Sequence, residues 1–198
     1  KKARERLIAK HNLYQIKSEL ALIKRYILEG RLWELAEMRC RAHPALLAGL
    51  RELGRHSGFL ERTEPLSREL AMFYTGPETR GRPSFHRYGK RLADRYVPSG
   101  DSVVFFQDEG KPHSRVYQQE FLRCRKAGAI PVVISEIGPV PEELDEIYPI
   151  AQSVYPEIPD METVADSERL AFEFLDRHGI TELIQYEDLP DVDAEVDV

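Results

Sequence analysis

The sequence predicts an α+β chain, in which a helical N-terminal segment precedes a three-layer α/β domain with a mostly parallel sheet. Apolar residues recur at helical spacing through residues 1–60. Beyond residue 100, short apolar runs alternate with amphipathic segments, which is typical of a parallel sheet covered by helices. The charge changes sign at the same place. Residues 1–100 carry 21 Lys and Arg against 11 Asp and Glu, whereas residues 101–198 carry 7 against 23.

The N-terminal segment is expected to contain three helices in succession. The first has one apolar face, formed by Ile16, Leu20, Ile23 and Ile27. Gly30 follows this face and suits the left-handed conformation that often ends a helix. A second amphipathic helix is predicted to start near Leu32. Pro44 is expected to be the first residue of a third helix, because a proline at that position gives up no helical hydrogen bond.

Residues 76–100 are predicted to form a basic connector, rich in glycine and proline, with a short helix around residues 83–95. Its cations alternate with aromatic residues, a combination that grips phosphates and stacks bases in proteins that bind nucleic acid. The alternative is that the aromatic residues pack on the core and the arginines face solvent. The candidate phosphate contacts are Arg80, Arg82, Arg87, Lys90 and Arg91.

Residues 101–190 are expected to form the α/β domain, and residues 191–198 an acidic tail that frays. The predicted elements, in chain order, are a strand at 103–106, a helix at 113–127, a strand at 130–134, a short helix at 141–147, a helix at 167–178 and a strand at 183–186. Parallel neighbouring strands would be joined by right-handed crossovers.

The composition argues against several classes of protein. No apolar run approaches the roughly 18 residues of a membrane-spanning helix, and no apolar segment follows the charged N-terminus as in a secretory signal. The two cysteines, Cys40 and Cys124, are far apart in sequence, so a reducing, cytoplasmic setting is expected. No phosphate-binding glycine loop or nucleophile-elbow motif is present. The acidic pair Asp108-Glu109 is interpreted as solvated surface.

His11 is the candidate metal ligand. A structural zinc ion needs four nitrogen or sulfur ligands in a tetrahedral arrangement. Cys40 stands alone far along the sequence, so the residues by themselves do not predict a complete zinc site. From the residues alone, His11 is better explained as a packed or solvent-exposed residue at the entry of the first helix.

Five segments together carry a family resemblance. They are His11-Asn12-Leu13-Tyr14, residues 29–35, residues 41–46, residues 73–79 and residues 138–152. The first four resemble the end of the catalytic domain of archaeal-type tRNA-guanine(15) transglycosylases, and the fifth resembles the α/β domain that follows it. The resemblance implies that residues 1–75 are the helical end of a TIM-barrel domain, with a remnant of its zinc subdomain.

The resemblance also implies a function. Enzymes of this family exchange guanine-15 in the tRNA D-loop for preQ0 in archaeosine biosynthesis, using two aspartates of the barrel. Neither aspartate maps onto this chain, so a part or split subunit of the enzyme is implied, with no catalytic residue of its own. His11 matches the histidine that completes a zinc site with a Cys-x-Cys-x-x-Cys cluster, which this sequence lacks. The implied partners are tRNA, the barrel portion that carries the cluster, and a second copy in a dimer.

Two alternatives remain open. The chain can be a non-catalytic assembly or tRNA-binding module, because a basic face docks an acidic partner as well as RNA. It can also be a copy of the paralogue archaeosine synthase, which adds lysine. Of the paralogue's Pro-Cys-x-x-x-Lys-Pro-Tyr signature only Lys111-Pro112 is retained. That departure favours the transglycosylase.

Overall fold

The N-terminal segment is helical, as predicted, in the computed structural model, which describes residues 2–189. Its helices are α1 (Lys2–Leu28), α2 (Leu32–Cys40), α3 (Pro44–Gly54) and the short α4 (Ser57–Leu60). Gly30 adopts a left-handed φ of 64° after α1, and Pro44 is the first residue of α3. His43 caps α3, because its Nδ1 accepts the backbone N–H of Ala45 at 3.1 Å.

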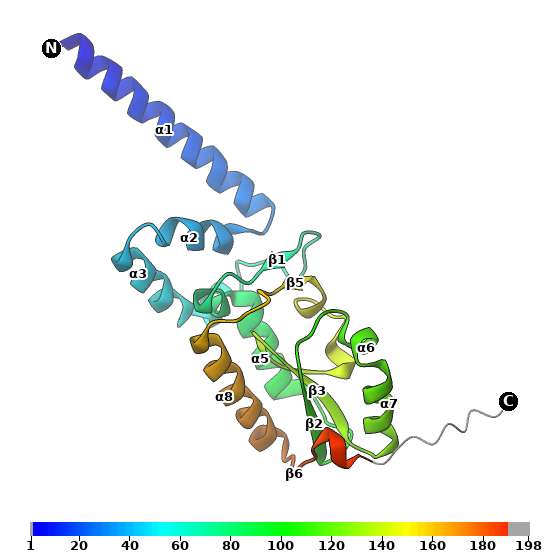
Figure 1. Cartoon of the computed structure of the whole chain (residues 1–198). Helices are drawn as coiled ribbons and strands as arrows, with labels where there is room; N and C mark the ends of the chain where they lie inside the picture. Colours follow the sequence, from blue (N-terminus) through cyan, green and yellow to red (C-terminus); the bar gives the residue numbers. More distant parts are fainter. Residues whose placement is uncertain (1, 190–198) are drawn as a thin grey trace.

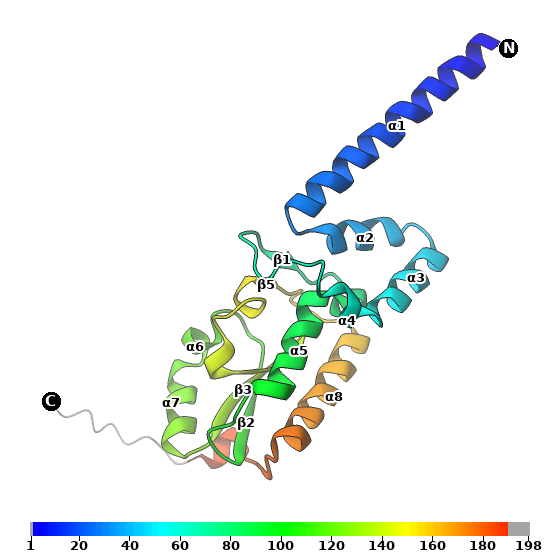
Figure 2. The same ribbon diagram turned by 180° about the vertical axis from the view of Figure 1, so that it is seen from behind.

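Helix α1 projects away from the rest of the molecule (Figures 1 and 2). Tyr26, near its C-terminal end, is the one buried residue of this helix. Several large apolar side chains are therefore exposed along it, among them Leu7, Leu13, Ile16 and Leu20. No helix of residues 2–189 combines the length and hydropathy that crossing a membrane requires. The apolar face of α1 is a surface without a partner in the described part of the chain.

The α/β part has a four-stranded sheet in the order β4-β3-β2-β6. Its strands are β2 (Ser102–Gln107), β3 (Ile130–Ser135), β4 (Gly138–Pro141) and β6 (Glu182–Leu183). Strand β2 runs parallel to both β3 and β6, whereas β4 is antiparallel to β3. The sheet is thus mostly parallel, as the sequence predicts.

Helices cover both faces of this sheet, which gives the predicted three layers (Figures 1 and 2). Helices α5 (Pro83–Arg95) and α8 (Met161–His178) lie on one face. Helices α6 (His113–Val116) and α7 (Gln118–Lys126) lie on the other. The 3₁₀ turns of this part are η2 (Glu142–Leu144), η3 (Ile150–Gln152) and η4 (Tyr186–Asp188).

The main core joins segments from both halves of the sequence. It contains Val103 and Val132 of the sheet, Phe121 of α7 and Phe85 and Tyr88 of α5. A second, two-stranded parallel sheet pairs β1 (Met72–Phe73) with β5 (Ser153–Val154). Both sets of contacts cross the boundaries predicted near residues 75 and 100. The aromatic residues of the connector pack on the core, which was the alternative reading of their pattern.

Four predicted elements differ from the structure. The short helix predicted at 141–147 is replaced by the edge strand β4 and the turn η2. Prolines 139 and 141 lack an N–H and are tolerated because β4 pairs on one side only. The helix predicted at 113–127 is divided at Tyr117 into α6 and α7. The strand predicted at 183–186 is the two-residue β6, and α8 starts earlier than predicted because Asp160 caps it, accepting the N–H of Thr163 at 2.9 Å. The predicted tail at 191–198 lies outside the described residues.

Candidate nucleic-acid interface and metal ligand

Arg82, a predicted phosphate contact, is the centre of a buried ionic cluster. Its side chain is 0% exposed. Its Nε donates to Oε1 of Glu64 at 2.5 Å, and its Nη1 donates to Oε1 of Glu34 at 3.0 Å. Its Nη2 donates to the carbonyl of Gly30 at 3.0 Å. The guanidinium therefore joins the start of α5 to α2 and to the turn after α1.

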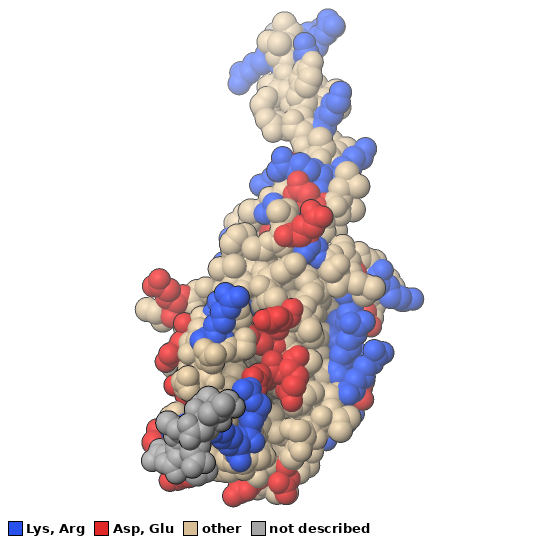
Figure 3. Space-filling model, turned by 90° about the vertical axis from the view of Figure 1, so that its right-hand side faces the viewer, with Lys and Arg blue, Asp and Glu red and all other residues tan. Residues whose placement is uncertain are grey.

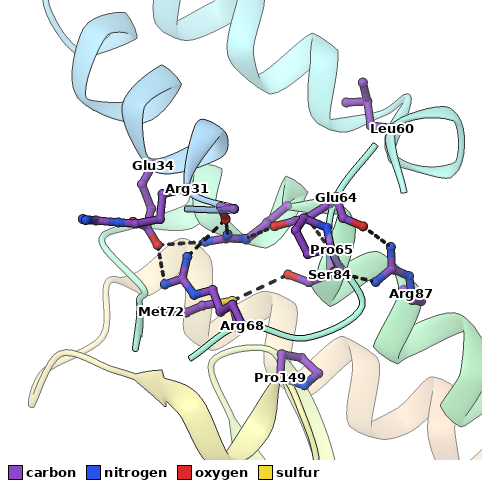
Figure 4. A network of polar contacts seen from close by, with 12 residues as sticks. Arg31, Glu34, Leu60, Glu64, Pro65, Arg68, Met72, Ser84, Arg87 and Pro149 are labelled. Atoms are coloured by element: carbon purple, nitrogen blue, oxygen red, sulfur yellow. Dashed lines mark hydrogen bonds and ion pairs between the residues drawn. The ribbon is translucent and has the colours of Figure 1, made fainter. Parts of the chain in front are cut away.

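Two further arginines converge on Glu34 (Figure 4). Arg31 Nε lies 2.8 Å from Oε2 of Glu34, and Arg68 Nη2 lies 2.7 Å from its Oε1. Burial alone would raise the pKa of Glu34, but the hydrogen bonds from Arg31, Arg68 and Arg82 outweigh it, and the pKa is lowered. Glu34 is therefore held as a carboxylate, and its negative charge compensates the three arginines that bind it.

Two other predicted contacts also make internal bonds. Arg87 donates to the main-chain carbonyls of Glu61, Glu64 and Pro65, so it braces the loop before β1 (Figure 4). Arg80 lies in the 3₁₀ turn η1 (Pro77–Gly81) and is mostly buried. It donates to the carbonyl of Glu136 and to Oγ of Ser167, the latter at 2.9 Å. Arg87 and the Nη2 group of Arg80 are thus bonded within the fold, whereas Nε and Nη1 of Arg80 are buried without a hydrogen-bond partner among the described residues.

Lys90 and Arg91 are exposed on α5. Lys90 is 58% exposed, and its Nζ lies 3.9 Å from Oε1 of Glu61, a weak surface pair. Arg95, which the sequence-based set omits, lies one helical turn beyond Arg91 and is exposed as well. Arg95 could have been predicted from the sequence, because it lies four residues after Arg91 within the predicted helix. Arg91 and Arg95 flank a hollow of about 270 Å³ between α5 and residues 144–149.

One edge of the surface is rich in Lys and Arg side chains (Figure 3). Lys and Arg side chains gather along the right-hand edge of the face in Figure 3, while Asp and Glu side chains lie at its centre with other Lys and Arg side chains beside them. A phosphate backbone would meet repulsion at the centre and attraction at the edge. Of the five predicted contacts, the structure leaves Lys90 and Arg91 free to meet an external anion. The prediction of tRNA contact itself stays a prediction.

His11 lies on the exposed surface of α1. Within residues 2–189 no group of three or more His, Cys, Asp or Glu residues is arranged to hold a metal ion. Cys40 is half-buried at the end of α2, and Cys124 is buried in the α/β core. His11 is thus an accessible imidazole, and the described residues do not complete a tetrahedral zinc site around it.

No family model matches the chain. It is similar to proteins named tRNA-guanine(15) transglycosylase. The protein of that name from Methanococcus maripaludis strain S2 is 36% identical over 178 residues, which are 90% of this chain and 27% of that protein. The one from Methanothermobacter thermautotrophicus is 38% identical over 166 residues, 80% of this chain and 25% of that protein. The one from Methanosarcina barkeri is 40% identical over 161 residues, 81% of this chain and 30% of that protein.

The fold is that of an α+β protein whose relatives are transglycosylases. The resemblance inferred from the sequence motifs is confirmed: most of the chain is similar to one part of proteins named tRNA-guanine(15) transglycosylase. It spans 25 to 30% of the length of these relatives.

Proposed function

We propose that the chain is part of a tRNA-guanine(15) transglycosylase that exchanges guanine-15 of tRNA for preQ0. Its contribution is assembly and tRNA contact, and the catalytic aspartates lie outside this chain. The observation that carries the proposal is the similarity to enzymes of that name across most of the chain, at 36 to 40% identity for the three relatives described. A cytoplasmic setting and a dimeric assembly belong to the same proposal.

The proposed tRNA contact is the exposed face of α5, formed by Lys90, Arg91 and Arg95. Arg91 and Arg95 make no side-chain hydrogen bond or ion pair within residues 2–189, so binding a phosphate breaks no internal contact. Arg80, Arg82 and Arg87 support this face from inside. Replacing those three would remove internal bonds and would report on stability rather than on tRNA binding.

Charge removal on α5 tests this contact. In an Arg91→Ala/Arg95→Ala variant, the affinity for tRNA should fall, and the slope of log K against log salt should shrink by about 1 to 2, because each phosphate contact contributes about 0.7 to 0.9. The matched control is Arg115→Ala/Lys126→Ala, which removes the same charge from α6 and α7 on the opposite face of the sheet. Equal tRNA affinity and equal salt slopes in the wild type and both folded variants would rule out the α5 contact.

We also propose that His11 is one ligand of a structural zinc ion shared with the preceding barrel portion. The imidazole is accessible and lies on a helix whose apolar face has no partner in the described part of the chain. A zinc ion bound there would cross-link α1 to the segment that supplies the cysteines. The apolar residues of α1 would then pack against the same portion.

A further inference from the structure

A large cavity lies at the carboxyl ends of the parallel strands β2 and β3, where none of the proposed tRNA contacts lies. Its volume is about 1210 Å³, and its walls include residues 107–111 at the end of β2, residues 135–136 at the end of β3, residues 153–157, one side of α8 and Leu183 of β6. In open α/β sheets, ligands bind in the crevice beyond the carboxyl ends of the strands. The position is therefore that of a binding site for a small molecule.

Glu136 is the side chain in this cavity that most clearly lacks a hydrogen-bond partner. It lines the cavity, is 8% exposed, and its Oε2 has no hydrogen-bond partner among the described residues. A buried carboxyl oxygen without a partner destabilises the fold unless a ligand or water donates a hydrogen bond to it. Burial raises the pKa of Glu136 to about 7, and the nearby Asp108 adds to that shift.

Lys111 is the one cation in the lining, and the fold already uses it. Its Nζ donates to the carbonyls of Ile150 at 2.9 Å and Ser153 at 3.0 Å, and it lies 3.7 Å from the centre of the Tyr155 ring. Burial lowers the pKa of Lys111 to about 8. Its charge is thus directed at main-chain oxygens and an aromatic ring. Lys111 therefore does not offset the negative charge of the carboxyl groups in the lining.

The rest of the lining defines the ligand. The lining contains five carboxyl groups and one cation. The carboxyl groups belong to Asp108, Glu109, Glu136, Glu157 and Glu168. Apolar wall comes from exposed side chains that include Val164, Phe172 and Leu183. An anion would meet repulsion here, whereas a cationic head with an apolar body would meet both kinds of wall.

We propose that this cavity binds a small organic cation, an ammonium or guanidinium group carried on an apolar body, with Glu136 accepting its hydrogen bond. Asp108 is held in place beside Glu136, because its Oδ1 accepts the N–H of Gly110 at 3.2 Å and its Oδ2 lies 3.2 Å from Nε2 of His113. The site is independent of the proposed tRNA contact and of zinc.

Titration of the whole chain with n-pentylammonium, and with pentanoate as the matched anion, tests the proposal by calorimetry or NMR at pH 8. The ammonium ion should bind saturably and the carboxylate should not. Glu136→Gln should weaken ammonium binding about tenfold or more, since a charge-assisted hydrogen bond is lost. Glu146→Gln, which removes an exposed carboxylate outside the cavity, should leave it unchanged.

Phe172→Ala provides a second variant that tests the site without touching a buried group, since Phe172 is exposed on α8. It should weaken pentylammonium more than methylammonium, because only the longer cation reaches the apolar wall. Equal binding of ammonium and carboxylate, absence of saturation up to millimolar concentration, or equal losses in Glu136→Gln and Glu146→Gln would each overturn the proposal. If Glu136→Gln does not fold, an unchanged affinity in Phe172→Ala would overturn it.

Discussion

At the scale of single residues, the partners of an arginine decide what it does. Arg82 and Arg91 lie in the same short stretch of basic sequence. Arg82 meets Glu34, 48 residues earlier, and Glu64, 18 residues earlier, so its charge is neutralised inside the fold. Arg91 meets neither and faces solvent. The sequence predicts that cations gather here, but it does not say which of them find a carboxylate after folding.

Glu136 gives a prediction of stability against pH. Its pKa is about 7 in the folded chain and about 4.5 when unfolded, so the folded state holds the proton more tightly. Arg80 and Lys111 face this carboxyl and favour its charge, whereas Asp108 and burial oppose it. The contribution of Glu136 to the free energy of unfolding is therefore most favourable at acid pH and is lost as the pH rises from about 4.5 through 7.

Denaturant unfolding of the wild type and of Glu136→Gln at pH 5 and pH 8 measures this contribution. Relative to the variant, the wild type should lose about 2 to 3 kcal/mol between the two pH values. Groups other than Glu136 cancel in the difference. A difference between the two proteins that does not change with pH would show that Glu136 titrates normally.

At the scale of elements, close backbone contact sets how α3 and η1 meet. A Cβ added to Gly81 would lie 3.0 Å from Cα of Gly54 and 3.2 Å from the ring of Trp33. Arg51 reinforces the junction, because it binds Glu78 of η1 at 2.9 Å and Glu162 of α8 at 3.0 Å. Neither glycine has enough room for a side chain.

Two glycine substitutions should have opposite effects on stability. Gly81→Ala should reduce the free energy of unfolding by about 1 to 3 kcal/mol, because a tightly packed backbone must move. Gly49→Ala is the matched control, since a Cβ there meets nothing within 4 Å, and it should stabilise α3 by about 0.5 to 1 kcal/mol. Thermal and denaturant unfolding measure both. Equal effects of the two changes would contradict the close-contact account.

The same scale shows what could be predicted from the sequence. Long periodic helices and buried apolar strands were predicted, because their patterns are local. Strands β1, β5 and β6 have two residues each, too few to leave a pattern. The β4 segment reads as a helix entry because of its glycine and prolines, and only its place at the sheet edge makes it a strand. The cavity could not be predicted, because its walls come from five segments that are separate in the sequence.

At the scale of the whole molecule, α1 and the α/β part differ in how much of their apolar surface is buried. The α/β part has a core shared with α5, whereas α1 buries one residue and exposes a basic, apolar surface. Such a surface favours a partner portion rather than solvent. The family resemblance located this portion correctly as one that relatives carry in a longer protein.

Metal analysis tests the role of His11 at this scale. The chain alone should hold no stoichiometric zinc, and zinc should appear when it is combined with the portion that carries the Cys-x-Cys-x-x-Cys cluster. His11→Ala should abolish that zinc, whereas His56→Ala, an exposed histidine away from α1, should retain it. Stoichiometric zinc in the isolated chain would contradict the shared site.

The ionic cluster beneath α1 has a mechanical consequence. Gly30 ends this 27-residue helix, and its carbonyl is held by Arg82 at 3.0 Å and Arg68 at 3.3 Å. At 1.5 Å per residue, His11 lies within α1 at roughly 28 Å from Gly30. A tilt of about 10° at Gly30 would move the imidazole by about 5 Å, more than twice a zinc–nitrogen bond. The buried arginines thus fix the orientation of α1. A small change in its angle at Gly30 becomes a large displacement of His11.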